Sequence, residues 1–223
     1  MSEKARLSRR ERGLATKERL FEAAISLFAK KGYDKVTVDE ICEKVGVTKG
    51  AFYHHYRSKD QIILEEFKQM DEHYVRVAEE ISSLPSSIEK LRAFNRAAIT
   101  LMAELGVTLM KVLYHSQIAP HMRKPYLADG RRSLYRITGE LIREGQERGE
   151  IRDDLPSEEL AAMLIDCFRG QIYHWCLCNG AFDLVGTCDR LMDLLVDSLR
   201  PPQRARPRGN SGKPPGRRPS RPA

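Results

Sequence analysis

The sequence has little that would place the chain in a membrane or outside the cell. Among its 223 residues there is no apolar run of about 18, so we expect no membrane-spanning segment. The start, MSEKARLSRRERG, lacks the apolar stretch of a secretory signal. We therefore expect a cytoplasmic chain with no membrane among its partners.

Cysteines are present without the spacing that a metal site needs. The five cysteines form no CxxC pair and no zinc-binding pattern, and the cytoplasm keeps thiols reduced. We interpret them as free thiols, mostly buried, and we expect neither a metal nor a cofactor. The alternative is a redox or metal sensor built from Cys176, Cys178 and Cys188, which lie close together in the sequence.

The short motifs of common enzymes are also absent. The sequence contains no phosphate-binding loop GxxxxGK(S/T), no GxSxG turn, no HExxH pair and no GxGxxG fingerprint. We therefore expect no catalytic residues, and an enzyme is the weakest of the functional hypotheses.

What the sequence does have is an uneven charge. Residues 1–61 hold 14 Lys and Arg against 9 Asp and Glu, a balance of +5, whereas residues 62–200 hold 17 against 22, a balance of −5. The end, 201–223, adds seven basic residues, seven prolines and no acid. A nucleic-acid surface is therefore expected in the first part and not in the second. The tail should be disordered, either solvated or adding non-specific, salt-sensitive affinity for DNA.

Nearly every segment repeats its apolar residues with the period of an α-helix, and no hairpin signal is present. We predict an all-α fold with a basic arm at 1–15, a three-helix unit at 16–61, a larger helical domain at 62–200 and a tail at 201–223. The helices are expected at 16–31, 38–45, 49–56, 59–81, 88–103, 106–118, 126–148, 157–180 and 186–199.

Two short helices are joined by a tight turn within the first sixty residues. Thr37 and Glu40 have the spacing of a capping box. Gly46 is placed to end that helix in the left-handed conformation, and Thr48 is the next N-cap residue. This pattern indicates a helix-turn-helix, whose second helix enters the major groove of DNA.

The second of these helices has small and polar side chains on its outer surface. On a helical wheel Phe52 and Tyr56 fall on one side, where they should anchor the helix to its neighbours, and Gly50 and His54 point directly away. Small residues allow a close approach, while cationic and hydrogen-bonding groups suit phosphates and base edges. The two flanks carry Lys49 and Tyr53 and, opposite them, Ala51 and a more structural His55.

The stretch GYDKVTVDEICEKVGVTKGAFYHHYRSKDQI, together with the helix before it, resembles the N-terminal domain of the TetR family of bacterial transcription regulators. The resemblance runs without a gap from Thr16 to Ile62. The rest of the chain resembles that family only in architecture, as an all-helical domain for ligand binding and dimerisation.

The resemblance implies roles for individual residues of the N-terminal unit. Thr37 would add a phosphate contact to its capping role, while Gly50 and Ala51, by the small size of their side chains alone, would let the backbone come close to DNA. The basic arm, with Arg6, Arg9, Arg10 and Arg12, would either enter a minor groove or stay solvated. Phosphate contacts are expected from Thr48, Lys49, Tyr53 and Lys59. Base contacts are expected from Lys49, Gly50 and His54.

In the larger domain the last two helices are the expected homodimer interface. The helix at 157–180 is apolar over more than half of its circumference, as expected for a helix that buries two faces. Packing within the domain's own core is the alternative. The leucines of the last helix that could serve either purpose are Leu191, Leu194, Leu195 and Leu199.

An apolar pocket between the helices of 60–175 is expected to bind a small apolar or amphipathic effector. For each pocket residue, plain core packing is the alternative. His115, His121 and His174 could serve as polar groups of that pocket or as metal ligands. The expected lining residues are Met70, Tyr74, Phe94, Met102, Met110, Tyr114, Tyr135, Phe168 and Trp175.

These patterns together favour a ligand-responsive transcriptional repressor. It would bind a palindromic double-stranded operator as a homodimer and be released by its effector. The alternative keeps the DNA binding but makes the acidic domain a docking surface for another protein. The sequence does not separate repression from activation.

Overall fold

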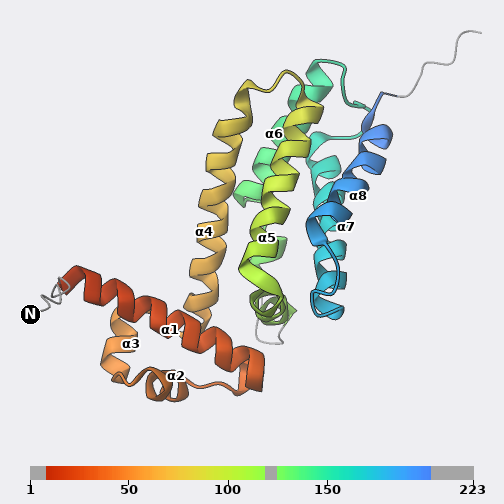
Figure 1. Cartoon of the computed structure of the whole chain (residues 1–223). Coiled ribbons are helices and arrows are strands. Elements are labelled where there is room, and N and C mark those ends of the chain that lie inside the picture. Colours follow the sequence, from red (N-terminus) through yellow and green to blue (C-terminus); the bar gives the residue numbers. More distant parts are fainter. Residues whose placement is uncertain (1–8, 119–124, 202–223) are drawn as a thin grey trace, which may run out of the picture.

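The computed structural model describes residues 9–118 and 125–201, and all regular structure within them is helical. Figure 1 shows the small unit formed by the first helices lying across one end of a helical bundle. The all-α prediction is therefore confirmed. The predictions made for residues 1–8, for His121 and for the tail from residue 202 onward lie outside the described residues.

The small unit contains α1 (Arg9–Lys31), α2 (Val38–Val45) and α3 (Lys49–His55), with a 3₁₀ turn at Tyr33–Lys35 between the first two. The first helix includes residues 9–15, where we expected an arm. Within this helix the Thr16 hydroxyl donates to the Arg12 carbonyl oxygen at 2.8 Å. The acidic Glu11 lies in the first turn, where it complements the helix dipole.

The core of this unit forms where the three helices meet. Leu20 of α1, Ile41 of α2 and Phe52 of α3 are all fully buried. Tyr56, directly after α3, is buried as well, and its hydroxyl donates to the Lys17 carbonyl oxygen at 3.4 Å. The prediction that Phe52 and Tyr56 anchor the short helix is confirmed.

The bundle begins with α4 (Lys59–Glu80) and α5 (Ser87–Ile118). α4 follows α3 after a short link, so it joins the small unit directly to the bundle (Figure 1). α5 is interrupted at Gly106, whose φ of 83° and ψ of 155° are not helical. This break agrees with the two separate helices predicted at 88–103 and 106–118.

The remaining helices are α6 (Ser133–Glu147), α7 (Ser157–Leu177) and α8 (Leu184–Leu199). α6 packs against α7, and α8 packs against α5. The helix predicted at 126–148 is wrong in its first part, which is a 3₁₀ turn at Tyr126–Ala128. There the Tyr126 amide donates to the side-chain oxygen of Gln117, and Asp129 binds Arg131, so these groups are not used for a helix.

By length and composition α5 would be apolar enough to cross a membrane. Its apolar side chains have another use, because Leu91, Phe94, Ile99, Met102 and Leu113 are buried in the bundle core. The break at Gly106 also divides the helix. We therefore interpret α5 as the central core helix.

Candidate nucleic-acid interface and interior cavity

The turn between α2 and α3 has the predicted capping groups. The Thr37 hydroxyl accepts from the Glu40 amide at 3.3 Å, and the Glu40 carboxylate accepts from the Thr37 amide at 2.8 Å. Gly46 is left-handed, with φ 73° and ψ 40°. The amides of Gly46 and Val47 both donate to the Cys42 carbonyl oxygen, at 2.9 and 3.0 Å, which closes α2. The capping-box and glycine predictions are confirmed.

Thr48 then caps α3, because its hydroxyl accepts from the Ala51 amide at 3.2 Å. The two short helices are thereby held by caps at both ends of a tight turn. Arg19 of α1 adds a hydrogen bond to the Val45 carbonyl oxygen at 2.6 Å. The small unit therefore holds α3 rigidly against α1 and α2, as a helix-turn-helix requires.

The outer face of α3 has few internal partners. Tyr53 is 54% exposed, and its ring contacts Phe52 edge-on at 5.4 Å. Among the described residues Lys49 forms one exposed ion pair, with Asp39 at 2.7 Å, and such pairs contribute little to stability. A Cβ at Gly50 would meet nothing closer than the Thr48 hydroxyl at 3.7 Å, so its own fold does not require glycine there.

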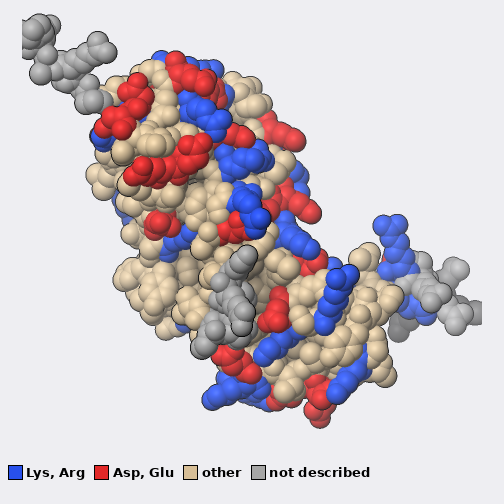
Figure 2. Space-filling model, turned by 180° about the vertical axis from the view of Figure 1, so that it is seen from behind, with Lys and Arg blue, Asp and Glu red and all other residues tan. Residues whose placement is uncertain are grey.

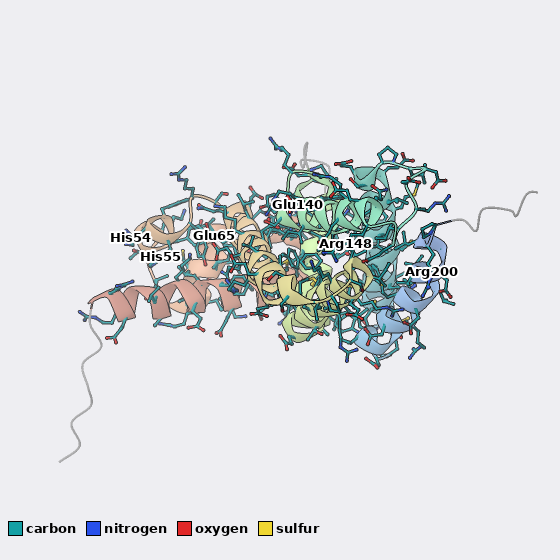
Figure 3. All side chains as sticks on the ribbon, turned by 90° about the horizontal axis from the view of Figure 1, so that it is seen from above. His54, His55, Glu65, Glu140, Arg148 and Arg200 are labelled. Atoms are coloured by element: carbon teal, nitrogen blue, oxygen red, sulfur yellow. The ribbon has the colours of Figure 1, made fainter. Side chains whose placement is uncertain are left out.

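The two adjacent histidines differ in their surroundings. His54 is exposed, whereas His55 is half-buried. Burial lowers the pKa of His55, and the neighbouring His54 and Lys17 lower it further. Figure 3 places both histidines at the α3 end of the molecule, opposite the end of α8 at Arg200. The structural interpretation of His55 agrees with these surroundings.

Lys59 lies in a setting that the sequence did not predict. Its ammonium group donates to the carbonyl oxygens of Tyr33, Asp34 and Val36, at 2.9, 3.4 and 3.1 Å. It also lies 4.6 Å from the centre of the Tyr33 ring. Because all three N–H donors are directed at these carbonyls, the expected phosphate contact of Lys59 has no support in the structure. Its role is to hold the 3₁₀ turn against the start of α4.

The larger domain and the smaller unit both carry acidic and basic side chains on their surfaces. In Figure 2 acidic and basic side chains are interleaved on the face shown, on the larger domain and on the smaller unit alike. Several bundle charges form ion pairs with each other, including Arg92 with Asp193 and Arg96 with Asp189.

An apolar cavity of about 70 Å³ lies within the bundle, between α4, α5, α6 and α7. This volume is below the roughly 300–1,000 Å³ that ligand pockets commonly have. Met70, Met102 and Met110 are among its walls, and methionines can rearrange around a guest. Seven of the nine residues predicted for a pocket line this cavity. They are Met70, Tyr74, Phe94, Met102, Met110, Tyr114 and Phe168.

The other two predicted residues, Tyr135 and Trp175, do not line the cavity. The Tyr135 hydroxyl accepts from Arg169 at 2.5 Å, which places it behind the cavity wall. The Trp175 indole donates to the Phe182 carbonyl oxygen at 3.1 Å, at the junction of α7 and α8. Both are amphipathic aromatics whose polar atoms have partners elsewhere in the bundle.

The polar members of the cavity wall were missed by the sequence analysis. They are Asn95, Arg132, Thr138 and Arg169. Arg132 belongs to the stretch ADGRRSL, which resembles a solvated loop, yet its side chain is 3% exposed and pairs with Asp71 of α4. The neighbouring Arg131 is 89% exposed. The two arginines differ in burial because of the tertiary packing of α4 on α6.

α7 and α8 present apolar side chains to the outside. Met163, Tyr173 and Leu177 of α7 are at least half exposed, and Leu194 of α8 is 73% exposed. The inner face of α7 is buried in the bundle, and burial of its second apolar face stays a prediction. Leu199 is buried, so this leucine belongs to the core and not to the outer face.

The cysteines and histidines do not gather into a metal site in the described parts of the chain. Cys42, Cys176 and Cys188 are buried thiols. Cys178 contacts His174, with 3.6 Å between sulfur and the ring nitrogen. His115 lies beside the surface groove formed with Phe28 and Tyr33, away from the cavity.

A rigid helix-turn-helix with an exposed second helix, joined through α4 to a bundle that encloses an apolar cavity, defines a DNA-binding regulator with a sensing domain. Comparison with known proteins gives the same class. The family described as bacterial regulatory proteins, tetR family, matches residues 20–65, and the tetracyclin repressor-like C-terminal domain matches residues 85–199.

The second match spans more than half of the chain, which therefore belongs to the TetR family. It is a ligand-responsive, DNA-binding transcriptional regulator of the repressor type, and this family is not enzymatic. The resemblance and the functional class inferred from the sequence are confirmed.

Individual relatives are distant but cover most of the chain. The fatty acid metabolism regulator protein of Bacillus subtilis (strain 168) is 23% identical over 184 residues, which are 81% of this chain and 93% of that protein. The fatty acid degradation regulator FadR of Bacillus halodurans has a TM-score of 0.72 at 20% identity, covering 83% of this chain and 96% of that one. FadR of Bacillus subtilis in complex with stearoyl-CoA has a TM-score of 0.69 at 22% identity, covering 82% and 99%. These structures share the fold of the chain.

Proposed function

We propose that the chain binds a palindromic DNA operator as a homodimer in the bacterial cytoplasm. In this proposal an acyl-CoA or a similar amphipathic molecule releases it by entering the bundle cavity. The observation that carries the DNA part is the outer face of α3, whose side chains are exposed and have little internal role.

On this face Lys49 and Tyr53 contact phosphates, joined by the caps Thr37 and Thr48 at the helix starts. Gly50 and Ala51 let the helix backbone approach the groove, where His54 reaches a base edge. Lys59 is not among these contacts, because its ammonium group is held by backbone carbonyls. One such helix reads too few bases for specificity, so a two-fold symmetric pair of half-sites is expected.

The homodimer is proposed to form through α7 and α8. Their outward side chains Met163, Tyr173, Leu177 and Leu194 are large, apolar and at least half exposed. Exposed apolar groups gathered on neighbouring helices are typical of an interface. In Figure 1 these helices lie on the side of the bundle away from α4, so pairing there leaves α3 of both subunits accessible.

The effector class is inferred from the cavity and from the relatives. The walls are almost entirely apolar, with a few polar groups that include Arg132 and Arg169, which suits a chain with a polar end. The similar fold of Bacillus subtilis FadR was solved in complex with stearoyl-CoA. An acyl chain needs more room than about 70 Å³, so its entry must displace helices or methionines, which is a route to release.

The DNA part is tested by selecting binding sites from a randomised duplex pool with the wild-type protein and with the variant Lys49→Ala/Tyr53→Ala. We expect a palindromic consensus from the wild type and none from the variant, which removes two exposed contacts without touching the core. Salt-sensitive binding without a consensus, equal in the two proteins, would contradict the assignment of α3.

A further inference from the structure

Arg132 is the cavity residue that its own fold leaves incompletely bonded. It lies directly before α6, and its side chain is only 3% exposed. The guanidinium carbon is 4.6 Å from the centre of the Tyr126 ring and 5.1 Å from that of Phe67. The aromatic rings thus fix the plane of the guanidinium at the cavity wall.

The ion pair between Arg132 and Asp71 satisfies only part of this group. Nε of Arg132 donates to Oδ2 of Asp71 at 3.2 Å. Nη2 lies 3.1 Å from Oδ1, but without the geometry of a hydrogen bond. Both Nη2 and Oδ1 are therefore buried without a hydrogen-bond partner among the described residues. Unpaired buried donors are rare because they cost free energy, and each calls for an explanation.

The second cavity arginine, Arg169, provides a comparison. Its Nη1 donates to the Tyr135 hydroxyl at 2.5 Å, and its Nη2 donates to the Leu127 carbonyl oxygen. Asp166 adds an ion pair at 3.4 Å. Arg169 is thus held by hydrogen bonds within the protein, whereas Nη2 of Arg132 is buried without a hydrogen-bond partner among the described residues.

We propose that Nη2 of Arg132 binds an oxygen acceptor of the effector, either a thioester carbonyl or a carboxylate. This contact favours binding of acyl compounds over apolar chains that lack such an oxygen. This inference rests on the proposed function, because it assigns the polar end of the same cavity. A charged donor in a nearly apolar enclosure gives a strong and directional contact to oxygen.

Tyr74 lies in the wall of the same cavity and supplies a second donor. Burial raises the pKa of Tyr74 to about 12, so the phenol stays protonated at neutral pH. The charges of Arg132 and Asp71 act on that pKa in opposite directions. An acyl oxygen would therefore meet two donors here, and no Asp or Glu is among the described residues that line the cavity.

Through Asp71, the contact between Arg132 and the effector can affect DNA binding. It belongs to α4, the helix that continues from α3, and it also accepts from the Tyr126 hydroxyl at 2.9 Å. Tyr126 in turn is tied to α5 through Gln117. An effector oxygen that competes for Arg132 therefore weakens the tie between α4 and the segment before α6, and this differential contact can favour a different position of α4.

The test measures binding of lauroyl-CoA, laurate and dodecylamine by titration calorimetry to the wild type, Arg132→Met, Asp71→Asn and Arg131→Gln. Arg131→Gln is the matched control, because this neighbouring arginine is 89% exposed and pairs with Asp129. We expect Arg132→Met to weaken the acyl probes by roughly tenfold to a hundredfold, as for loss of a hydrogen bond to a charged group. Asp71→Asn should tighten them, since it removes the competitor, and the control should bind like the wild type.

The opposite effects expected of Arg132→Met and Asp71→Asn on acyl binding distinguish a direct contact from a loss of structure. Arg132→Met can destabilise the bundle by leaving Asp71 unpaired, but a tighter Asp71→Asn complex cannot arise that way. Preference of the wild type for lauroyl-CoA over laurate identifies a thioester carbonyl, and the reverse preference a carboxylate; dodecylamine should bind more weakly than both.

Two results would overturn this inference and leave the proposed effector class intact. They are acyl binding by Arg132→Met equal to that of the wild type, and weakening by Asp71→Asn as large as that by Arg132→Met. If neither acyl probe binds the wild type, the proposed effector class fails together with the inference.

Discussion

Lys49 and Lys59 both lie at helix starts in the small unit, yet different groups hold their ammonium ions. Lys49 has one exposed carboxylate, that of Asp39, whereas Lys59 has three backbone carbonyls and an aromatic ring. The first can exchange its partner for a phosphate at little cost, and the second cannot.

Replacing Lys59 by Met should therefore destabilise the protein by about 2 kcal/mol, since it removes charge-assisted hydrogen bonds and a cation–π contact. Urea denaturation measures this change. In operator binding, the slope of log affinity against log salt should stay as in the wild type. A shallower slope would restore Lys59 as a phosphate contact.

Replacing Lys49 by Ala is expected to do the reverse. Stability should change little, because an exposed ion pair contributes little. The salt slope of operator binding should fall by about two for a dimer, because each phosphate contact contributes about 0.9. Titrations at several salt concentrations check the slope, and an unchanged slope would contradict the proposed contact.

At the scale of elements, the cap of α2 makes the small unit sensitive to acid. The Lys31 ammonium group, followed by the Thr37 amide, lowers the pKa of Glu40 to about 2, from an ordinary value of about 4.3. Because this pKa is depressed in the folded state, the contribution to stability is complete above the ordinary value. It is lost as pH falls from there towards 2.

Glu40→Gln should therefore reduce the free energy of unfolding most at pH 6–7, and its difference from the wild type should shrink towards pH 3. Denaturation in urea across this pH range measures the trend. Glu43→Gln on the same helix is the control and should show no such trend. A difference between wild type and Glu40→Gln that stays constant with pH would rule out the carboxylate as its source.

The break in α5 gives a second prediction at this scale. Gly106 has a φ of 83°, which side chains rarely adopt, whereas Gly139 lies within α6 with open space at its Cβ position. Gly106→Ala should destabilise the protein by about 1–2 kcal/mol. Gly139→Ala should stabilise it by about 0.5–1 kcal/mol through helix propensity. Thermal unfolding of both variants measures these changes. Equal shifts of the melting temperature in the same direction would contradict the different roles assigned to the two glycines.

Helices and caps of the small unit could be predicted from the sequence because their signals are local. Thr37, Gly46 and Thr48 act on residues within four positions, so their spacing already contains the geometry. The segment from Tyr126 to Arg132 could not be predicted, because Gln117 and Asp71, distant in sequence, bind its groups. The binding of the Lys59 ammonium group by backbone carbonyls could not be predicted for the same reason, because Tyr33 and Val36 are distant in sequence.

For the whole molecule, the central structural question is the pairing of two chains. Leu177→Glu/Leu194→Glu should yield a particle with the mass of one chain in light scattering and weaken operator binding, because both leucines are exposed on the proposed interface. Val75→Glu, on an exposed position of α4, should keep the mass of two chains. A wild type that is already monomeric on and off DNA would contradict the proposed interface.

The cavity could be predicted only in part at this scale. Helical period and side-chain type pointed to Met70, Phe94 and most of the other apolar walls, which the bundle does bring together. The polar residues of the cavity wall were not predicted, because the burial of Arg132 depends on how α4, α6 and the turn before α6 pack together. Volume and polar contacts of a cavity are properties of the whole bundle.

The most direct test of the account is the response of the protein–operator complex to an acyl-CoA. A fluorescent duplex carrying the selected palindrome is bound by the protein, and its anisotropy is followed as stearoyl-CoA is added, with coenzyme A alone as the control. The account predicts that the anisotropy falls to that of free DNA with stearoyl-CoA and stays high with coenzyme A. A complex that remains intact when stearoyl-CoA saturates the protein would contradict it.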